Sequence, residues 1–405
     1  MAGPALVGRW SAVAGPGPAR VGRGSAVAGQ ALVGRVSGAF LARRWREVRL
    51  RYVPEMIALA RHPADLPWPT TDWPEGELAA DVDAVSLTDA LRAIRDLPEG
   101  GGVSLAMLVV HRGRVVAEQY GPGTSGETTL ISWSMAKSIT QAVFGVLVGD
   151  GRIDVDAPAA VPEFVGSQKS VITVRDLLAM KSGLEFVEDY VDAAASHCLE
   201  MLFGSGSEDH AHYAASRTRL HRPGDVWNYS SGTTNILARI AGDVVAQREH
   251  GSTEEAMRAF LGERLFGPLG MTSAEAKFDP SGTFVGSSYV YATARDFARF
   301  GYLYLRDGCW EGRRILPEGW VEYARTEVAV DPEPPHFGYG AHWWIWRDQP
   351  GSLAAHGYEG QYIIVVPERD LVVVHLAKVP ADVRSPLLAQ LNRVINAFPL
   401  CRAAI

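Results

Sequence analysis

Apolar side chains recur along this chain with two different periods, and each period predicts a kind of regular element. Alternating or continuous apolar runs predict strands at 104–111, 114–120, 362–366 and 371–376. The first two runs flank a tight turn at Gly113, so we expect them to form a β-hairpin. Apolar positions three and four residues apart predict helices at 83–97, 135–147, 174–180, 234–245, 293–306 and 385–398.

The order of these elements predicts the fold class. Two hairpins lie far apart in the chain, with mostly helical spacing from 166 to 290 between them. This order predicts an α/β (α+β) fold, in which one antiparallel sheet is built from both ends of the chain, is flanked by helices and carries an inserted all-helical domain. Continuous apolar runs in the last two strands indicate a sheet covered on both faces. We expect 46–165 and 291–405 to form the sandwich domain and 166–290 the helical domain, with a cleft between them.

The first 45 residues have a different composition from the rest. Ala, Gly, Val and Arg dominate, no acidic residue precedes Glu47, and the run Ala5–Arg9 recurs at Ala31–Arg35. Glycines and arginines interrupt every apolar stretch that a secretory signal would need, and a transit peptide is the weaker alternative. We therefore interpret 1–45 as a disordered leader or as sequence upstream of the true start.

Composition narrows the function classes. The 405 residues are 47% hydrophobic and 21% charged, with a net charge of −7 and a pI near 5.9. An acidic chain is a poor partner for nucleic acid or an anionic membrane, so we expect a small-molecule substrate and a monomer or homodimer. The three cysteines, Cys198, Cys309 and Cys401, form no disulfide framework, and no apolar run has transmembrane length. These features favour a cytoplasmic enzyme.

The first candidate for chemistry is Ser134, which lies three residues before Lys137 at the predicted start of the 135–147 helix. Residues three apart share a helix face, so the two side chains can touch. A lysine in a dry pocket can take the proton of a serine hydroxyl, and the free N–H groups of a helix start suit an oxyanion. The pair alone also arises by chance in a chain of this length.

Two further segments carry candidate residues. Tyr229 and Ser231 come directly before the predicted 234–245 helix, and a phenol beside a cationic lysine is expected to have a lowered pKa. Simple packing of Tyr229 is the alternative. His356–Gln361 is a glycine-bearing turn before a core strand, where glycine permits close approach of a ligand; a plain tight turn is the alternative there.

Taken in this order, the three segments resemble the signature of the serine β-lactamase and penicillin-binding-protein superfamily. The similarity is greatest to the class C branch, and within it to the 6-aminohexanoate-dimer hydrolases and related esterases, which keep Tyr-Ser-Ser at 229–231. The phrases at 174–184 and 293–301 are also typical of the branch.

The resemblance implies a serine hydrolase without metal or organic cofactor. Ser134 would form an acyl-enzyme, and Lys137 and Tyr229 would exchange the proton. It also implies that a further set of residues contacts the substrate or the oxyanion. These residues are Tyr190, Ser231, His356, Gly357, Tyr358, Gly360 and Gln361.

Two departures from the family pattern affect the substrate. The Lys-Thr-Gly element is missing, and either His356-Gly357-Tyr358 or the following Glu359-Gly360-Gln361 takes its place. Ser231 stands where an asparagine is usual. Both changes favour an ester or a linear amide over a β-lactam. The alternatives are a β-lactamase or D-alanyl peptidase, and a non-catalytic binding protein on the same fold.

Two other clusters are weaker candidates for a functional site, one for metal binding and one for binding an acyl chain. His210 and His212, with Asp209 and His197, have no third metal ligand fixed by spacing. The aromatic run 343–346 is expected to pack as a cleft wall, where it could also bind an apolar acyl chain.

Overall fold

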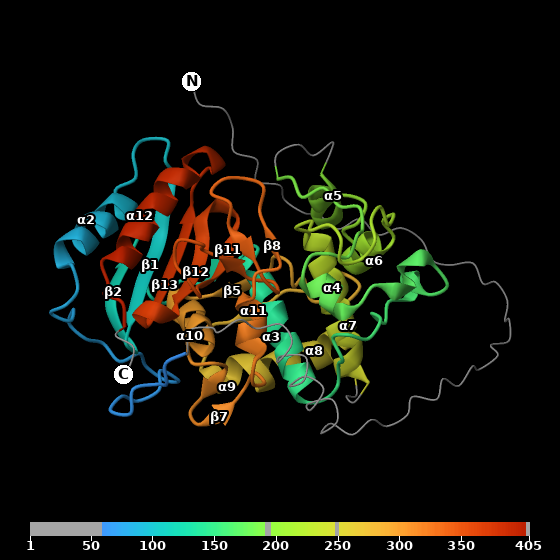
Figure 1. The fold of residues 1–405 in the computed structure, drawn as a ribbon, viewed down its shortest axis with the longest axis horizontal. Helices are drawn as coiled ribbons and strands as arrows, with labels where there is room; N and C mark the ends of the chain where they lie inside the picture. The colour runs from blue at the N-terminus through green and yellow to red at the C-terminus, as the bar shows by residue number, and fades with distance from the viewer. Residues whose placement is uncertain (1–58, 191–195, 248–250, 402–405) are drawn as a thin grey trace. The chain divides into compact units, whose positions relative to one another are not determined.

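An eight-stranded antiparallel sheet is the centre of the fold (Figure 1). The computed structural model describes residues 59–190, 196–247 and 251–401. The strand order is β2-β1-β13-β12-β11-β10-β9-β8. The strands are β1 (Val103–His111), β2 (Arg114–Tyr120), β8 (Ala329–Val330), β9 (Gly338–Tyr339), β10 (Trp344–Ile345), β11 (Leu353–Gly357), β12 (Gln361–Val366) and β13 (Leu371–Lys378).

The sheet joins the two ends of the chain, as the hydrophobic pattern predicts. His111 pairs with Arg114 across the predicted β1–β2 turn, where Gly113 has a φ of 80°. β1 then pairs with β13 along its length, from Val103 opposite Lys378 to His111 opposite Leu371. The predicted α/β fold with an antiparallel sheet and flanking helices is confirmed.

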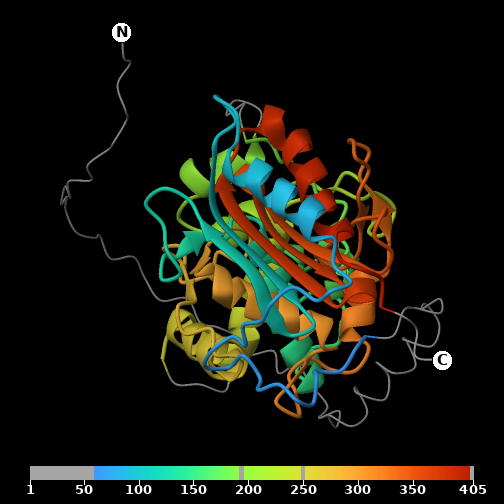
Figure 2. The same ribbon diagram turned by 90° about the vertical axis from the view of Figure 1, so that its left-hand side faces the viewer.

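Helices cover both faces of the sheet, which explains the continuous apolar strands. Successive strand side chains point to opposite faces, so Val109 and Val373 pack with α2 (Ala84–Arg95) and α12 (Arg384–Asn396). Figure 2 shows these two helices lying across one face. Leu108 and Val374 belong to the core on the other face, with α3 (Met135–Gly149) and α10 (Ala294–Leu305).

The middle of the described chain is mostly helical. α4 begins after the capping box of Thr173 and Asp176 and ends at Leu178, earlier than predicted, because Met180 has a φ of 56°. α7 begins at Ser231, earlier than predicted, because the Ser230 side chain accepts from the Thr233 N–H. The other α-helices of the described residues are α5 (His197–Phe203), α6 (His210–Ala215), α8 (Thr253–Leu261), α9 (Gly267–Leu269) and α11 (Trp320–Arg325).

Two small sheets complete the fold. They contain β3 (Leu130–Ile131), β4 (Glu275–Ala276) and β5 (Val290–Ala292), and β6 (Cys309–Trp310) with β7 (Arg313–Arg314). The division into sandwich and helical domains stays a prediction, and the 1–45 leader lies outside the described residues. Within the described ranges, no helix is both long enough and apolar enough to cross a membrane.

Candidate active site

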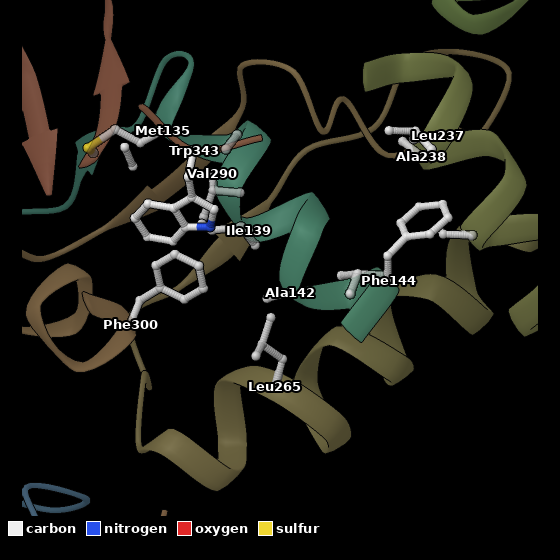
Figure 3. Packing of buried hydrophobic residues seen from close by; sticks show 14 of the residues in the cluster. Met135, Ile139, Ala142, Phe144, Leu237, Ala238, Leu265, Val290, Phe300 and Trp343 are labelled. Atoms are coloured by element: carbon white, nitrogen blue, oxygen red, sulfur yellow. The ribbon is translucent and has the colours of Figure 1, made fainter. Parts of the chain in front are cut away.

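Ser134 lies at the N-cap of α3, a helix that is buried on nearly all sides. Figure 3 shows Ile139 and Ala142 of α3 in the same apolar cluster as Phe300 and Trp343, with Phe144 beside Leu237 and Ala238 of α7. This packing holds the start of the helix in place. Trp133, directly before the serine, has a φ of 42°, a strained conformation of a kind that clusters at functional sites.

The Lys137 side chain makes three polar contacts around Ser134. Its Nζ lies 2.8 Å from Ser134 Oγ, 2.9 Å from Ser231 Oγ and 3.1 Å from the Ser287 carbonyl oxygen. The side chain is 2% exposed, so few waters compete for these bonds. The structure therefore brings together Ser134, Lys137 and Ser231, which the sequence analysis selected separately.

Tyr229 lies beside the same ammonium, but its pKa shifts in the direction opposite to the expected one. Lys137 Nζ is 4.9 Å from the centre of the phenol ring, and its charge lowers the pKa of Tyr229. Burial among aromatic rings, including Trp344 at 5.1 Å and Tyr339 at 5.9 Å, has the larger effect and raises that pKa. The expectation of a lowered pKa was wrong, and Tyr229 is a neutral phenol that can donate a proton at neutral pH.

Glu188 is a member of this cluster that the sequence analysis missed. Its carboxylate accepts from the Ser231 N–H at 2.7 Å, from the Ser231 hydroxyl at 2.5 Å and from the Tyr190 hydroxyl at 2.8 Å. Oε1 also lies 3.9 Å from Lys137 Nζ. The only local signal for Glu188 was its position two residues before Tyr190, because its main partner is 43 residues away in sequence.

The 356–361 segment lies opposite the serine, with different roles for its residues. The His356 ring stacks on the Trp344 ring, and its Nε2 accepts a hydrogen bond from the Trp346 indole N–H at 2.8 Å. Burial holds the pKa of His356 well below its ordinary value, so this imidazole is neutral and is no substitute for a cationic lysine. Tyr358 and Gly360 belong to the turn η4 (Tyr358–Gly360), which lines the cavity in front of Ser134.

Gln361 holds this turn and is not among the residues that line the cavity. Its amide donates to the Tyr358 carbonyl at 3.0 Å and to the Ala377 carbonyl, and accepts from the Ala377 N–H at 3.0 Å. A further hydrogen bond joins this turn to the residue before Ser134, because the Trp133 indole N–H donates to the Glu359 carboxylate at 3.3 Å. The backbone of η4 is thereby fixed relative to Ser134.

Gly357 allows the end of β11 to approach the backbone just before the serine. A Cβ at this position would lie 2.3 Å from the Ser132 carbonyl oxygen. We expect Gly357→Ala to push the strand away from Ser134, lowering the free energy of unfolding by about 1–3 kcal/mol and reducing kcat/KM. Thermal unfolding and ester hydrolysis measure the two effects.

Gly262→Ala is the matched control for this substitution. Apart from its chain neighbours and the backbone of its own helix, no atom lies within 4 Å of a Cβ at Gly262, which has helical φ and ψ. We therefore expect the stability of this variant to be equal or slightly higher. A Gly357→Ala protein with unchanged stability and activity would show that this close approach is unimportant.

Comparison with known proteins places this site in a family. The model of the Beta-lactamase family matches residues 89–395. The chain belongs to the Beta-lactamase family. It is 28% identical over 327 residues to the 6-aminohexanoate-dimer hydrolase of Paenarthrobacter ureafaciens, covering 72% of this chain and 79% of that relative.

Solved structures with similar folds agree with this assignment to the Beta-lactamase family. A Bacillus anthracis protein, provisionally named a 6-aminohexanoate-dimer hydrolase, has a TM-score of 0.65 at 22% identity, covering 89% of this chain and 95% of that one. A family VIII carboxylesterase has a TM-score of 0.61 at 15% identity, covering 80% and 99%. At such identities the two structures show a shared fold.

Family membership confirms the resemblance and the interpretation of the chain as a serine hydrolase. The roles of the individual residues around Ser134 remain predictions. The proteins that this chain resembles include one named as a 6-aminohexanoate-dimer hydrolase and one named as a carboxylesterase.

Two cavities meet at Ser134 in this member of the Beta-lactamase family. The larger, about 650 Å³, contains Tyr229, Glu188, Trp344 and Arg384 in its lining. The smaller, about 160 Å³, is lined mainly by apolar groups, namely Trp133, Leu199, Leu202 and Phe203. Tyr190 and Tyr358, whose rings are 5.1 Å apart, line both cavities. Ser134 can thus receive the two halves of a substrate on different sides.

The histidine pair selected as a weak metal candidate has other partners. His212 Nδ1 lies 2.7 Å from Glu163, whereas His210 Nδ1 lies 3.9 Å from Asp279. Among the described residues, no group of three or more His, Cys, Asp or Glu side chains is placed to hold a metal ion.

Proposed function

We propose that this protein hydrolyses an ester or a linear amide through an acyl-enzyme at Ser134. The observation that carries the proposal is the 2.8 Å contact between Lys137 Nζ and Ser134 Oγ at the start of a buried helix. Lys137, once neutral, takes the hydroxyl proton as Oγ attacks the substrate carbonyl. Tyr229, a neutral phenol, donates a proton to the leaving group.

Backbone N–H groups stabilise the oxyanion in this proposal. The donors are the N–H of Ser134 and one from the 358–361 segment, and each such donor contributes on the order of 3 kcal/mol. A water molecule then attacks the acyl-enzyme, and the same Lys137–Tyr229 pair accepts its proton. Tyr190 and Ser231 lie beside the reacting carbonyl, with Ser231 held by Lys137 and Glu188.

The position of Tyr229 orients the substrate. Tyr229 lines the larger cavity but not the smaller one, whereas Ser134 lines both. Because Tyr229 protonates the leaving group, that group occupies the larger cavity and the acyl group occupies the smaller, mainly apolar one. The acyl group is therefore short and uncharged.

The charges around the larger cavity favour this function over a β-lactamase. Among the described residues that line it, Arg384 is the one cation, against the carboxylates of Glu188, Asp331, Glu333 and Glu359. A β-lactam carries a carboxylate, which this excess of negative charge disfavours. His356, which is neutral, adds no positive charge.

A substrate panel tests the proposal directly. The protein is incubated with p-nitrophenyl butyrate, with N-butylbutanamide as an uncharged linear amide, and with a chromogenic cephalosporin, and it is labelled in parallel with a fluorophosphonate probe. We expect labelling of the protein and fastest hydrolysis of the ester or amide. Fastest hydrolysis of the cephalosporin would make the protein a β-lactamase, and absence of labelling would contradict an active serine.

The smaller cavity leads to a prediction about acyl charge. We compare p-nitrophenyl butyrate with p-nitrophenyl 3-aminopropanoate, which has the same number of heavy atoms but ends in an ammonium group. We expect kcat/KM to be about 10- to 100-fold lower for the aminated ester, because the ammonium loses hydration against Leu199 and Leu202. The leaving group is identical, so equal values would place the acyl group outside this cavity.

A further inference from the structure

The contacts of Lys137 limit where its lone pair can point. The Ser287 carbonyl can only accept, so one N–H of Lys137 is committed to it. The Ser231 hydroxyl donates its own proton to Glu188, so its oxygen accepts a second N–H from Lys137. Ser134 Oγ is the remaining partner. A charged Lys137 donates its third N–H to Ser134, whereas a neutral Lys137 directs its lone pair there.

Lys137 must therefore lose one proton before it can act as a base toward Ser134. The Ser287 carbonyl cannot accept it, and Ser134 is the group to be deprotonated. The Ser231 hydroxyl is different, because it bonds Lys137 on one side and the Glu188 carboxylate on the other. It can accept a proton from the amine while its own proton passes to Glu188.

We propose that Glu188 accepts this proton, with Ser231 as the relay, and so generates the neutral Lys137 that activates Ser134. An N–H bond of Lys137 breaks and an O–H bond to Ser231 Oγ forms, while the original Ser231 O–H bond breaks and an O–H bond to Glu188 Oε1 forms. The products are an amine, an unchanged serine hydroxyl and a carboxylic acid. Rotation about the Cε–Nζ bond of Lys137 then turns the lone pair toward Ser134 Oγ.

The surroundings of Glu188 reduce the free-energy difference between the Lys137–Glu188 ion pair and the neutral pair, in which Lys137 is an amine and Glu188 a carboxylic acid. The titratable groups that face Glu188 are Lys137, Tyr190, Cys198, Tyr229 and Tyr339, and Lys137 is the one basic side chain among them. The Lys137 and Glu188 side chains are 2% and 8% exposed. Burial of two charges costs free energy, so the difference between the ion pair and the neutral pair is smaller here than in water. The inference rests on the proposed function, since it concerns the acylation of Ser134.

Glu188→Gln tests the inference. The glutamine keeps the size of the side chain and can still accept from the Ser231 hydroxyl, but it cannot take up a proton. We expect the rate of fluorophosphonate labelling and the burst with p-nitrophenyl butyrate to fall about 10²-fold at neutral pH. The loss is expected to shrink at alkaline pH, where hydroxide removes the Lys137 proton instead. A structural defect would lower the rate equally at all pH values.

Two more variants complete the experiment. Glu185→Gln makes the same chemical change three residues away, outside both cavity linings, and is expected to label at the wild-type rate. Ser231→Ala removes the relay but keeps Glu188, so we expect the same pH-dependent loss; it also serves if Glu188→Gln fails to fold, as judged by circular dichroism.

The possible results separate this inference from the proposed function. An unlabelled wild-type protein contradicts the proposed function itself. A labelled wild type with equally fast labelling of Glu188→Gln overturns the relay alone. Faster labelling of Glu188→Gln at neutral pH also overturns it, because Glu188 would then act only as a counter-ion that keeps Lys137 charged.

Discussion

Ser134→Ala is expected to lower kcat for p-nitrophenyl butyrate by about 10⁴- to 10⁶-fold and to abolish fluorophosphonate labelling. Alanine removes the atom that forms the acyl bond in the proposed mechanism, while the helix N-terminus and the two cavities remain. The substitution also removes one of the hydrogen-bond acceptors of Lys137. Lys137 keeps its hydrogen bonds to Ser231 and to the Ser287 carbonyl. Steady-state kinetics and mass spectrometry of the labelled protein measure the two effects.

Ser138→Ala is the matched control on the same helix. The Ser138 hydroxyl donates to the His342 carbonyl at 2.8 Å and belongs to the buried structure behind the site. We expect this variant to be less stable by about 1 kcal/mol and to label fully. Labelling of Ser134→Ala at the wild-type rate would place the nucleophile elsewhere and would contradict the whole mechanism.

Local patterns predicted about half of the main sheet, and the reason lies in strand length. β1, β2, β12 and β13 are six to nine residues long, so their apolar runs are visible in the sequence. β8, β9 and β10 contain two residues each, too few to show any period. They exist because β11 and the aromatic residues around Trp344 provide pairing partners, which only the tertiary structure determines.

The residues of the candidate site also differ in whether local sequence patterns could predict them. Ser134 and Lys137 were predictable from spacing, because one helical turn fixes their distance. Glu188 was not, since it lies in a segment without periodicity and meets Ser231 only after folding. The direction of the Tyr229 pKa shift was also wrong, because it depends on how deeply neighbouring rings bury the phenol. The sequence shows which groups are present, whereas burial determines which of them are charged.

Tyr229→Phe is expected to lower kcat by about 10²- to 10⁴-fold with a smaller change in KM. Phenylalanine keeps the ring contacts with Trp344 and Tyr339, so the cavity wall is preserved. The substitution removes only the hydroxyl, which in the proposed mechanism donates a proton to the leaving group. Since the pKa of Tyr229 is raised, the wild-type phenol is protonated throughout the neutral range, and its contribution declines only at alkaline pH.

The leaving group decides how severe this loss is. p-Nitrophenolate departs without a proton, whereas an amine must be protonated to leave, so the Tyr229→Phe defect should be larger for a linear amide than for p-nitrophenyl butyrate. Trp227→Phe is the matched control, because Trp227 lies in the same aromatic cluster and lines the same cavity without carrying an acid. If Tyr229→Phe lost the same factor on both substrates, Tyr229 would act by packing, and another group would have to protonate the leaving amine.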